Sequence, residues 1–165
     1  MGTPRQTDRS GAAEAATVRL WLRLLGTAHA VESRLRARLQ GEFATTMPRF
    51  DAMAQLARVP EGMTMSALSQ RMMVTKGNIT GLIERMAAEG LVERTLDPRD
   101  RRATIVRLSA SGRHRFAAVA PVMRTWILEE LAGLEEDDID QLYRLLGRIR
   151  AAEGTGFQET EEDTP

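Results

Sequence analysis

The sequence predicts a mainly α-helical protein that carries one small β-hairpin. The 165 residues are 42% apolar but only 4% aromatic, and Leu, Ala, Met, Arg and Glu, which favour helices, dominate the composition. Most apolar residues recur every three to four positions, whereas two short runs in the middle of the chain alternate and are rich in β-branched residues. A chain of this length is expected to form one compact unit with frayed ends.

The N-terminal part is predicted to form a long helix and then a shorter one. Residues 14–46 contain the long helix and its connection, because apolar residues recur on one face between Arg-rich intervals. These apolar residues are Val18, Trp21, Leu22, Leu25, Ala28, Val31, Leu35 and Leu39. A helix this long in a small protein often packs against a partner. The shorter helix, 47–56, ends before the Pro-Glu-Gly turn at 60–62. Residues 1–13 are polar, and we expect them to be a disordered tail.

Two further short helices and a hairpin follow. Thr64 is a suitable cap for a helix over 64–73, and Thr75 for the next helix, from about residue 76 to residue 89. Gly90 follows this last helix, at the point where a left-handed residue is needed.

The β-hairpin is predicted from two β-capable runs, 91–95 and 104–108, which flank a charged loop that contains proline. Two short helices joined by a tight turn and followed by a hairpin form a winged helix-turn-helix arrangement. We therefore assign residues 47–112 to a winged helix-turn-helix lobe, in which the hairpin is the wing.

Residues 113–150 are predicted to form the C-terminal helices, because apolar residues again recur at helical spacing. These are Phe116, Val119, Met123, Trp126, Ile127 and Leu131, followed by Ile139, Leu142, Tyr143, Leu146 and Ile149. Residues 151–165 are acidic and contain Gly and Thr, so we expect a disordered tail.

Charge is distributed unevenly although the formal net charge is zero. Residues 1–63 carry 9 Arg and 6 Asp or Glu, residues 64–115 carry 10 Lys or Arg and 5 Asp or Glu, and residues 116–165 carry 4 Arg and 12 Asp or Glu. A basic middle segment is expected if that segment approaches phosphate groups. The alternative is a solvated charged face.

The helix over 76–89 has two different faces when it is projected at about 100° per residue. Its apolar face comprises Ile79, Leu82, Ile83 and Met86. The opposite face comprises Gly77, Gly81, Glu84 and Ala88, flanked by Asn78, Thr80 and Arg85. Each glycine costs about 1 kcal/mol in a helix, and close approach of the backbone to a DNA groove would explain that cost. The alternative is tight packing against another helix. Lys76, the only lysine, stands where a helix N-terminus can hold a phosphate.

The predicted wing concentrates three arginines within four residues, in the sequence DPRDRR at 97–102. Arginine side chains suit the narrow minor groove of DNA, where the negative potential is strongest. The alternative is a solubilising loop with local Arg–Asp pairs.

Several function classes are excluded by what the sequence lacks. The absence of cysteine excludes disulfides, thiolate metal sites, a cysteine nucleophile and a cysteine peroxide sensor. His29 and His114 are the only histidines, and the chain has no metal-ligand spacing, nucleophile motif or phosphate loop. We therefore expect no enzyme activity, no metal and no cofactor. No apolar run approaches the roughly 18 residues of a membrane span, so we expect a cytoplasmic protein without a membrane partner.

The stretch from residue 65 to Gly112 contains VTKGNITGLIERMAAEGLVERTLDPRDRRATIVRLSASG, in which a helix is followed by GLVER, DPRDRR, a leucine, and a serine that opens the next helix before a glycine. In this order of elements the stretch resembles the core of the MarR family of transcriptional regulators, in which the first of these helices is the recognition helix. The helical flanks match more loosely. The resemblance implies a triangular homodimer in which the N- and C-terminal helices interlock, so that 14–46 and 113–150 provide dimerisation helices. It also implies recognition helices in successive major grooves and wings in the flanking minor grooves.

The resemblance assigns roles to individual residues. The recognition positions are Thr75, Lys76, Gly77, Asn78, Thr80, Gly81 and Arg85. In the wing, Asp100 and Arg102 match the Asp-x-Arg pair of the family. Arg102 is then expected to contact the minor groove and Asp100 to orient the wing, with Arg99 and Arg101 in support.

The predicted function is that of a homodimeric repressor of transcription. It would cover a pseudo-palindromic operator in double-stranded DNA and leave when a small aromatic or anionic effector binds. Residues on the segments expected to line an effector pocket are Trp21, His29, Phe43, Phe50, Met53, Arg124 and Trp126. For the histidine and the aromatic residues, the alternative is ordinary core packing. The alternative function is a helical protein-interaction module, which would leave the outward glycines and the Arg-rich wing unexplained.

Overall fold

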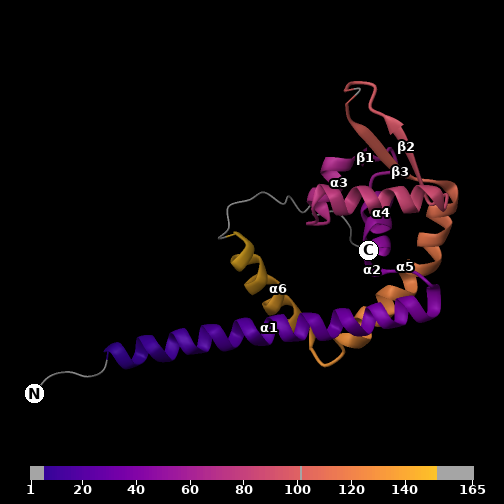
Figure 1. Cartoon of the computed structure of the whole chain (residues 1–165). Helices are drawn as coiled ribbons and strands as arrows, with labels where there is room; N and C mark the ends of the chain where they lie inside the picture. The colour runs from indigo at the N-terminus through magenta and orange to yellow at the C-terminus, as the bar shows by residue number, and fades with distance from the viewer. Residues whose placement is uncertain (1–5, 101, 152–165) are drawn as a thin grey trace, which may run out of the picture. The chain divides into compact units, whose positions relative to one another are not determined.

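A computed structural model of the chain describes residues 6–100 and 102–151 (Figure 1). The helices are α1 (Gln6–Phe43), α2 (Met47–Ala57), α3 (Met65–Arg71), α4 (Lys76–Ala88), α5 (Ala110–Glu130) and α6 (Glu136–Ala151). The strands are β1 (Met63–Thr64), β2 (Val92–Leu96) and β3 (Thr104–Leu108). These elements confirm the predicted fold class, mainly α-helical with a small hairpin. The chain divides into two compact units, and the boundary lies between Ile127 and Leu128. The length of the chain predicts a single compact unit.

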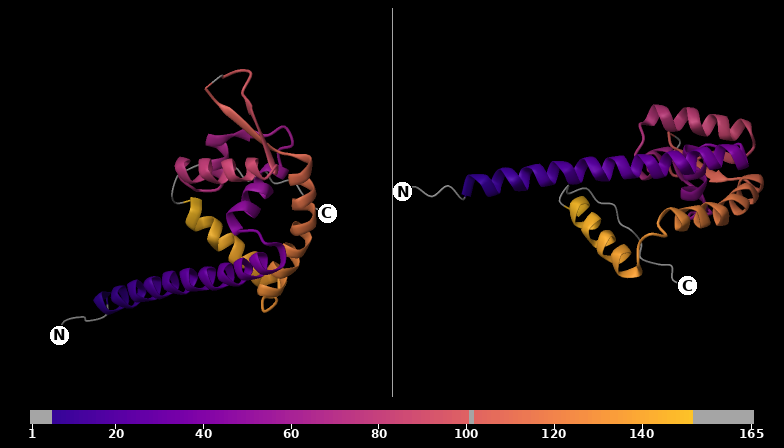
Figure 2. Two further views of the ribbon diagram at one scale, coloured as in Figure 1. Left: turned by 45° about the vertical axis from the view of Figure 1, so that its right-hand side comes forward. Right: turned by 90° about the horizontal axis from the view of Figure 1, so that it is seen from below.

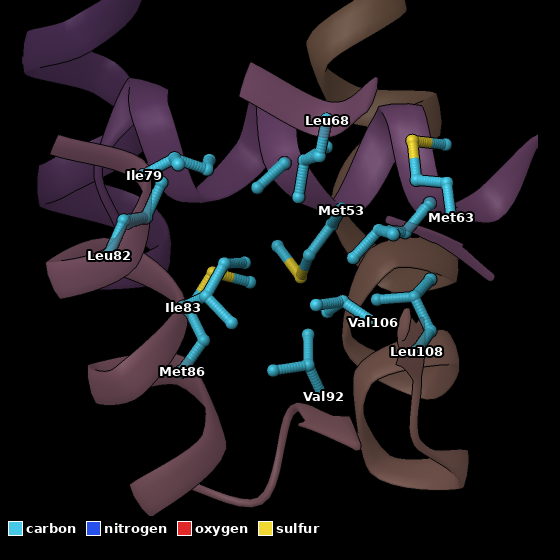
Figure 3. Close-up of a cluster of buried hydrophobic side chains, with 12 residues drawn as sticks. Met53, Met63, Leu68, Ile79, Leu82, Ile83, Met86, Val92, Val106 and Leu108 are labelled. Carbon is cyan, nitrogen blue, oxygen red and sulfur yellow. The ribbon is translucent and has the colours of Figure 1, made fainter. Parts of the chain in front are cut away.

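One hydrophobic core holds α2, α3, α4 and the sheet together (Figure 3). Its buried members are Ala52, Met53, Leu56, Met63, Leu68, Ile79, Leu82, Ile83, Met86, Val92, Val106 and Leu108. The four apolar residues predicted to form the inner face of α4 are all among them. Each such side chain stabilises the fold by about 1.5–3 kcal/mol when it leaves water. This core defines the lobe, by which we mean α2 to β3.

The sheet is antiparallel, with strand order β1-β3-β2. In the predicted hairpin, Val92 pairs with Leu108 at one end and Leu96 with Thr104 at the other. The two-residue strand β1, which the sequence did not predict, pairs with β3 on the far side from β2. It lies directly before α3, and the side chain of Thr64 accepts a hydrogen bond from the Ala67 amide at 3.2 Å, as expected of a helix cap.

Glycine at position 62 allows β1 to lie close enough to pair with β3. Its φ is +92°, and a Cβ atom at this position would lie 2.6 Å from the carbonyl oxygen of Val106. Only glycine avoids that overlap.

A second cluster of buried side chains joins the C-terminal half of α1 to α5. Its buried members are Leu35, Leu39, Val119, Met123 and Trp126. The ring of Trp126 lies 6.0 Å from that of Phe43, and the guanidinium of Arg38 lies 4.5 Å above the Trp126 ring. Such contacts add to the stabilisation from burial.

The N-terminal half of α1 is different, because its apolar residues are exposed. Val18, Trp21, Leu22 and Leu25 are each 49–60% exposed. In the second unit, α6 also exposes apolar residues, which are Ile139, Leu142, Tyr143, Leu145 and Ile149.

The structure differs from the predicted boundaries in two places. Helix α1 begins at Gln6, so residues 6–13 are helical and the expectation of a disordered tail is wrong for them. The predicted boundary between the lobe and the C-terminal helices, after residue 112, lies inside α5. Residues 1–5 and most of the predicted acidic tail, 152–165, lie outside the described residues. None of the described helices is long and apolar enough to cross a membrane.

Candidate nucleic-acid interface

Helix α4 presents a polar first turn to solvent. Thr75 is its cap, because the Thr75 hydroxyl accepts a hydrogen bond from the Asn78 amide at 3.4 Å. Lys76, Asn78 and Thr80 are exposed, and the Thr80 hydroxyl donates to the Lys76 carbonyl at 2.8 Å. The start of α4 is therefore held by side-chain hydrogen bonds. Among the described residues, the Lys76 ammonium and the Asn78 side-chain amide have no partner, so both can bind a ligand.

The two glycines of α4 do not pack against another helix in the described structure. A Cβ atom at Gly77 would find no side chain, and no backbone outside its own turns of helix, within 4 Å. At Gly81 the nearest atom would be a guanidinium nitrogen of Arg85, at 3.4 Å. The glycines instead leave the first two turns of the outer face of α4 without side chains at positions 77 and 81, so that the backbone there is open to close approach.

A hollow of about 360 Å³ adjoins this glycine face. Its lining comes from α2, the α3–α4 turn and α4, and comprises Pro48, Met72, Val74, Gly77, Asn78, Gly81, Leu82 and Arg85. Side chains of a partner that lies along α4 would have room here. The sequence did not predict the hollow, because its wall combines residues from three separate segments.

The hairpin projects beyond the helices of the lobe (Figures 1 and 2). Arg99, Asp100 and Arg102, three of the predicted wing residues, lie between its two strands. The Asp97 carboxylate accepts a hydrogen bond from the backbone amide of Arg99 at 2.8 Å, and the Asp100 carboxylate accepts one from that of Arg102 at 2.9 Å. The Ala103 amide also donates to the Asp100 carbonyl at 2.8 Å. The two aspartates thus shape the loop through its backbone.

Two of the three wing arginines carry a charge that is unpaired among the residues that the structure describes. Arg99 and Arg102 are exposed and make no ion pair with any of these residues. This contradicts the alternative of local Arg–Asp pairs for these two side chains. Arg101 lies outside the described residues.

The base of the wing is closed by an ion pair across the two strands. Arg107 reaches one carboxylate oxygen of Glu93 with two nitrogens, Nε at 2.8 Å and Nη2 at 2.7 Å. Glu93 and Arg107 are also register partners of the sheet. This pair is half-exposed, so its contribution to stability is small.

Further contacts fix the far end of α4. Glu89, which caps the helix, forms an ion pair with Arg49 of α2. Gly90 follows with φ +72°, as predicted, and its carbonyl accepts a hydrogen bond from the Ser109 hydroxyl at 2.5 Å. The same Ser109 oxygen accepts from the amide of Gly112 at 2.9 Å. The end of α4, the base of the wing and the start of α5 are therefore joined at one point.

The structure brings three of the seven predicted effector residues, Phe43, Phe50 and Trp126, into the cluster between α1 and α5. Met53 is fully buried in the core of the lobe. The Phe50 ring lies 5.8 Å from that of Phe116. Trp21 and His29 on α1, and Arg124 on α5, are exposed.

A second cavity, of about 410 Å³, lies between the α1–α2 connection, the end of α4 and the start of α5. It is lined by Ala44, Thr45, Arg49, Glu89, Leu91, Ser111, His114 and Arg115. Neither this cavity nor the hollow beside α4 has a predicted effector residue in its wall.

Asp51 is a titratable residue with a perturbed environment. It lies on α2, where burial, and then the negative charge of Glu32 on α1, raise the pKa of its carboxyl above the usual value. Neither residue belongs to α4 or to the wing, so this carboxyl is not part of the candidate interface.

Comparison with known proteins matches the sequence of the lobe to a protein family. A sequence model described as "MarR family" matches residues 45–103, which contain the α3–α4 pair and most of the wing. The chain is 32% identical over 134 residues to the "Transcriptional activatory protein BadR" of Rhodopseudomonas palustris, and the match covers 79% of this chain and 76% of that protein.

Solved structures show the same fold. AbsC, a MarR family transcriptional regulator from Streptomyces coelicolor, has a TM-score of 0.76 at 23% identity, covering 94% of this chain and 100% of AbsC. A mutant of MarR from E. coli, solved in complex with operator DNA, has a TM-score of 0.74 at 21% identity, covering 81% of this chain and 95% of that protein.

We predict that Gly81→Leu weakens DNA binding without weakening the fold. The leucine would occupy the open face of α4, whereas replacing glycine in an exposed helix stabilises it by up to about 1 kcal/mol. The affinity would be measured by fluorescence anisotropy. The DNA is the selected duplex, which is the sequence that the wild-type protein enriches from a random duplex library. We expect a loss of more than about tenfold in affinity, which is about 1.4 kcal/mol.

The matched control is Ala88→Leu, on the same face but at the end of α4, and it should retain affinity. An equal loss of thermal stability and affinity in Gly81→Leu would show that this face is buried.

We also predict that Arg102→Ala weakens binding to the selected duplex by about 1–3 kcal/mol and makes the affinity less sensitive to salt, because one phosphate-neutralising charge is lost. The melting temperature should not change, since the Arg102 side chain is exposed and forms no ion pair within the described part of the chain. Arg124→Ala removes an exposed arginine from α5 and serves as the control. Wild-type affinity and salt dependence in Arg102→Ala would exclude the wing from the interface.

Proposed function

The chain belongs to the MarR family, and we propose that it regulates transcription by binding specific sequences in double-stranded DNA. In this proposal α4 lies in the major groove and the wing reaches the neighbouring minor groove. The residues in contact are Thr75, Lys76, Gly77, Asn78, Thr80, Gly81 and Arg85 from α4, and Arg99, Asp100, Arg101 and Arg102 from the wing.

One observation carries this proposal, namely that two outward-facing glycines of α4 and unpaired arginines of the wing belong to the same closely packed lobe of the described structure. Gly77 and Gly81 allow the α4 backbone to approach a groove wall, and Asn78 and Arg85 flank them with groups that hydrogen-bond base edges or phosphates. Arg102 supplies an exposed guanidinium on the projecting hairpin. A protein-interaction module would need neither feature.

The test of DNA binding is selection from a random duplex library followed by affinity measurements at several salt concentrations. We expect an enriched sequence with approximate two-fold symmetry, and an affinity that falls at least about tenfold between roughly 50 and 200 mM salt, because phosphate contacts release counterions. Unselected duplex is the competitor that measures specificity. Failure to enrich any sequence at low salt would contradict the proposed function and favour the interaction module.

We also propose that the chain acts as a homodimer. Exposed apolar residues on the first half of α1 and on α6 are the support for this, since burial of such surfaces against a second copy is favourable. A two-fold symmetric dimer would also match a pseudo-palindromic operator.

Leu22→Glu is expected to convert the dimer into a monomer, because it places a charge in the apolar stripe of α1. Light scattering after size-exclusion chromatography would measure the mass. Arg23→Glu, which by helical projection points about 100° away from Leu22, is the matched control and should remain dimeric. A monomeric wild-type protein at micromolar concentration would refute the dimer.

The direction of control is the remaining part of the proposal. A dimer bound across a promoter would repress transcription, and a small aromatic or anionic effector that changes the spacing of its two lobes would release it. BadR is named as an activator, so a reporter gene with wild-type protein and with Arg102→Ala is needed to separate repression from activation. We propose that the protein acts in the cytoplasm by binding, and not by catalysis.

A further inference from the structure

Met73 combines a left-handed backbone with an exposed apolar side chain. It lies in the turn between α3 and α4, where its φ is +52° and its side chain is 83% exposed. No other large apolar side chain of the described residues is as exposed. Residues other than glycine, asparagine and aspartate seldom adopt this backbone conformation, because the Cβ atom then crowds the backbone.

The hydrogen bonds of the turn require that conformation. The Met73 amide donates to the Gln70 carbonyl at 3.1 Å, and the Val74 amide donates to the Ser69 carbonyl at 3.1 Å. This pair of bonds ends a helix in a Schellman motif, whose left-handed position is ordinarily occupied by glycine. Methionine at this position therefore destabilises the turn relative to glycine.

The Met73 side chain does not offset this strain by packing against the core of the lobe. Its neighbours Met72 and Val74 pack against the core of the lobe, whereas Met73 is not among the residues that do so. A strained residue that contributes no packing is a candidate for a contact made outside the folded chain. Two residues later comes Thr75, the cap of α4, followed by the exposed Lys76.

We propose that Met73 is a DNA-contacting residue, whose side chain packs on apolar surface of the duplex where α4 enters the major groove. The surfaces of that kind are the C5-methyl group of thymine and the deoxyribose ring. A methionine suits such a contact, because its unbranched thioether adapts to irregular surfaces. This inference rests on the proposed function and adds an apolar contact to the polar and charged ones named above.

The test is Met73→Gly, which removes the strain and the side chain together. The melting temperature should stay the same or rise by up to about 4 °C, because glycine is favoured at this position. Affinity for the selected duplex should fall about tenfold, while its dependence on salt stays the same, because no charge is lost. Met73→Asn, which also tolerates the left-handed backbone, should show the same loss. Met73→Leu retains an apolar side chain and should bind within about threefold of wild type.

Ala44→Gly is the matched control for strain. Ala44 also has a left-handed backbone, with φ +47°, at the end of α1 and outside the α4 and wing surface. This variant should gain stability in the same direction and retain full affinity for DNA. If Met73→Gly and Met73→Asn bind the selected duplex as tightly as wild type, the inference is wrong even though the protein binds DNA. A wild-type protein that selects no duplex contradicts the proposed function instead.

Replacing thymine by uracil in the selected duplex identifies the contacted group. If the contact is to a thymine methyl, the affinity of the wild-type protein for the uracil duplex should fall to that of Met73→Gly. The affinity of Met73→Gly should then be the same for both duplexes. If the contact is to deoxyribose, the uracil duplex should bind wild type normally and Met73→Gly weakly. Either result supports the contact, provided that Met73→Gly binds the original duplex more weakly than wild type does.

Discussion

Burial of one face of α4 is the constraint on which the candidate interface depends. Ile79, Ile83 and Met86 are at most 1% exposed in the core of the lobe, and their burial against α2, α3 and the sheet stabilises the fold strongly. A helix has a fixed angular repeat, so the position of these residues also determines where every other residue of α4 points. The glycine face is outward because the opposite face is held inward, and no separate interaction is needed to orient it.

The same core sets the position of the wing relative to α4. Val92 and Val106, from the two strands of the hairpin, are buried in the same cluster as the α4 residues. Beyond the core, the Ser109 hydroxyl bonds to Gly90, and Glu89 pairs with Arg49. A groove-binding helix and an arginine-bearing loop are useful together only at a constant separation, and close packing supplies it.

The surface that faces the proposed DNA is built from residues that are suboptimal for the folded chain alone. Glycine weakens the interior of α4, and methionine strains the turn before it. Arg99 and Arg102 add charge to the wing without an ion pair to any described residue. Protein stability is marginal, so such costs matter, and each has a direct explanation if the missing interactions form with a nucleic acid.

Local patterns in the sequence were enough to predict α4, its cap Thr75, its terminal Gly90 and the hairpin, because each depends on residues close together in the chain. The two faces of α4 followed from periodicity alone. Only the tertiary structure decided that Phe43 and Trp126 pack together, that β1 pairs with β3, and that Met73 is left-handed and exposed. Strand β1 is too short to show a period, and methionine carries no signal for such a turn. These features arise from contacts between distant segments and from backbone hydrogen bonds, which residue type does not encode locally.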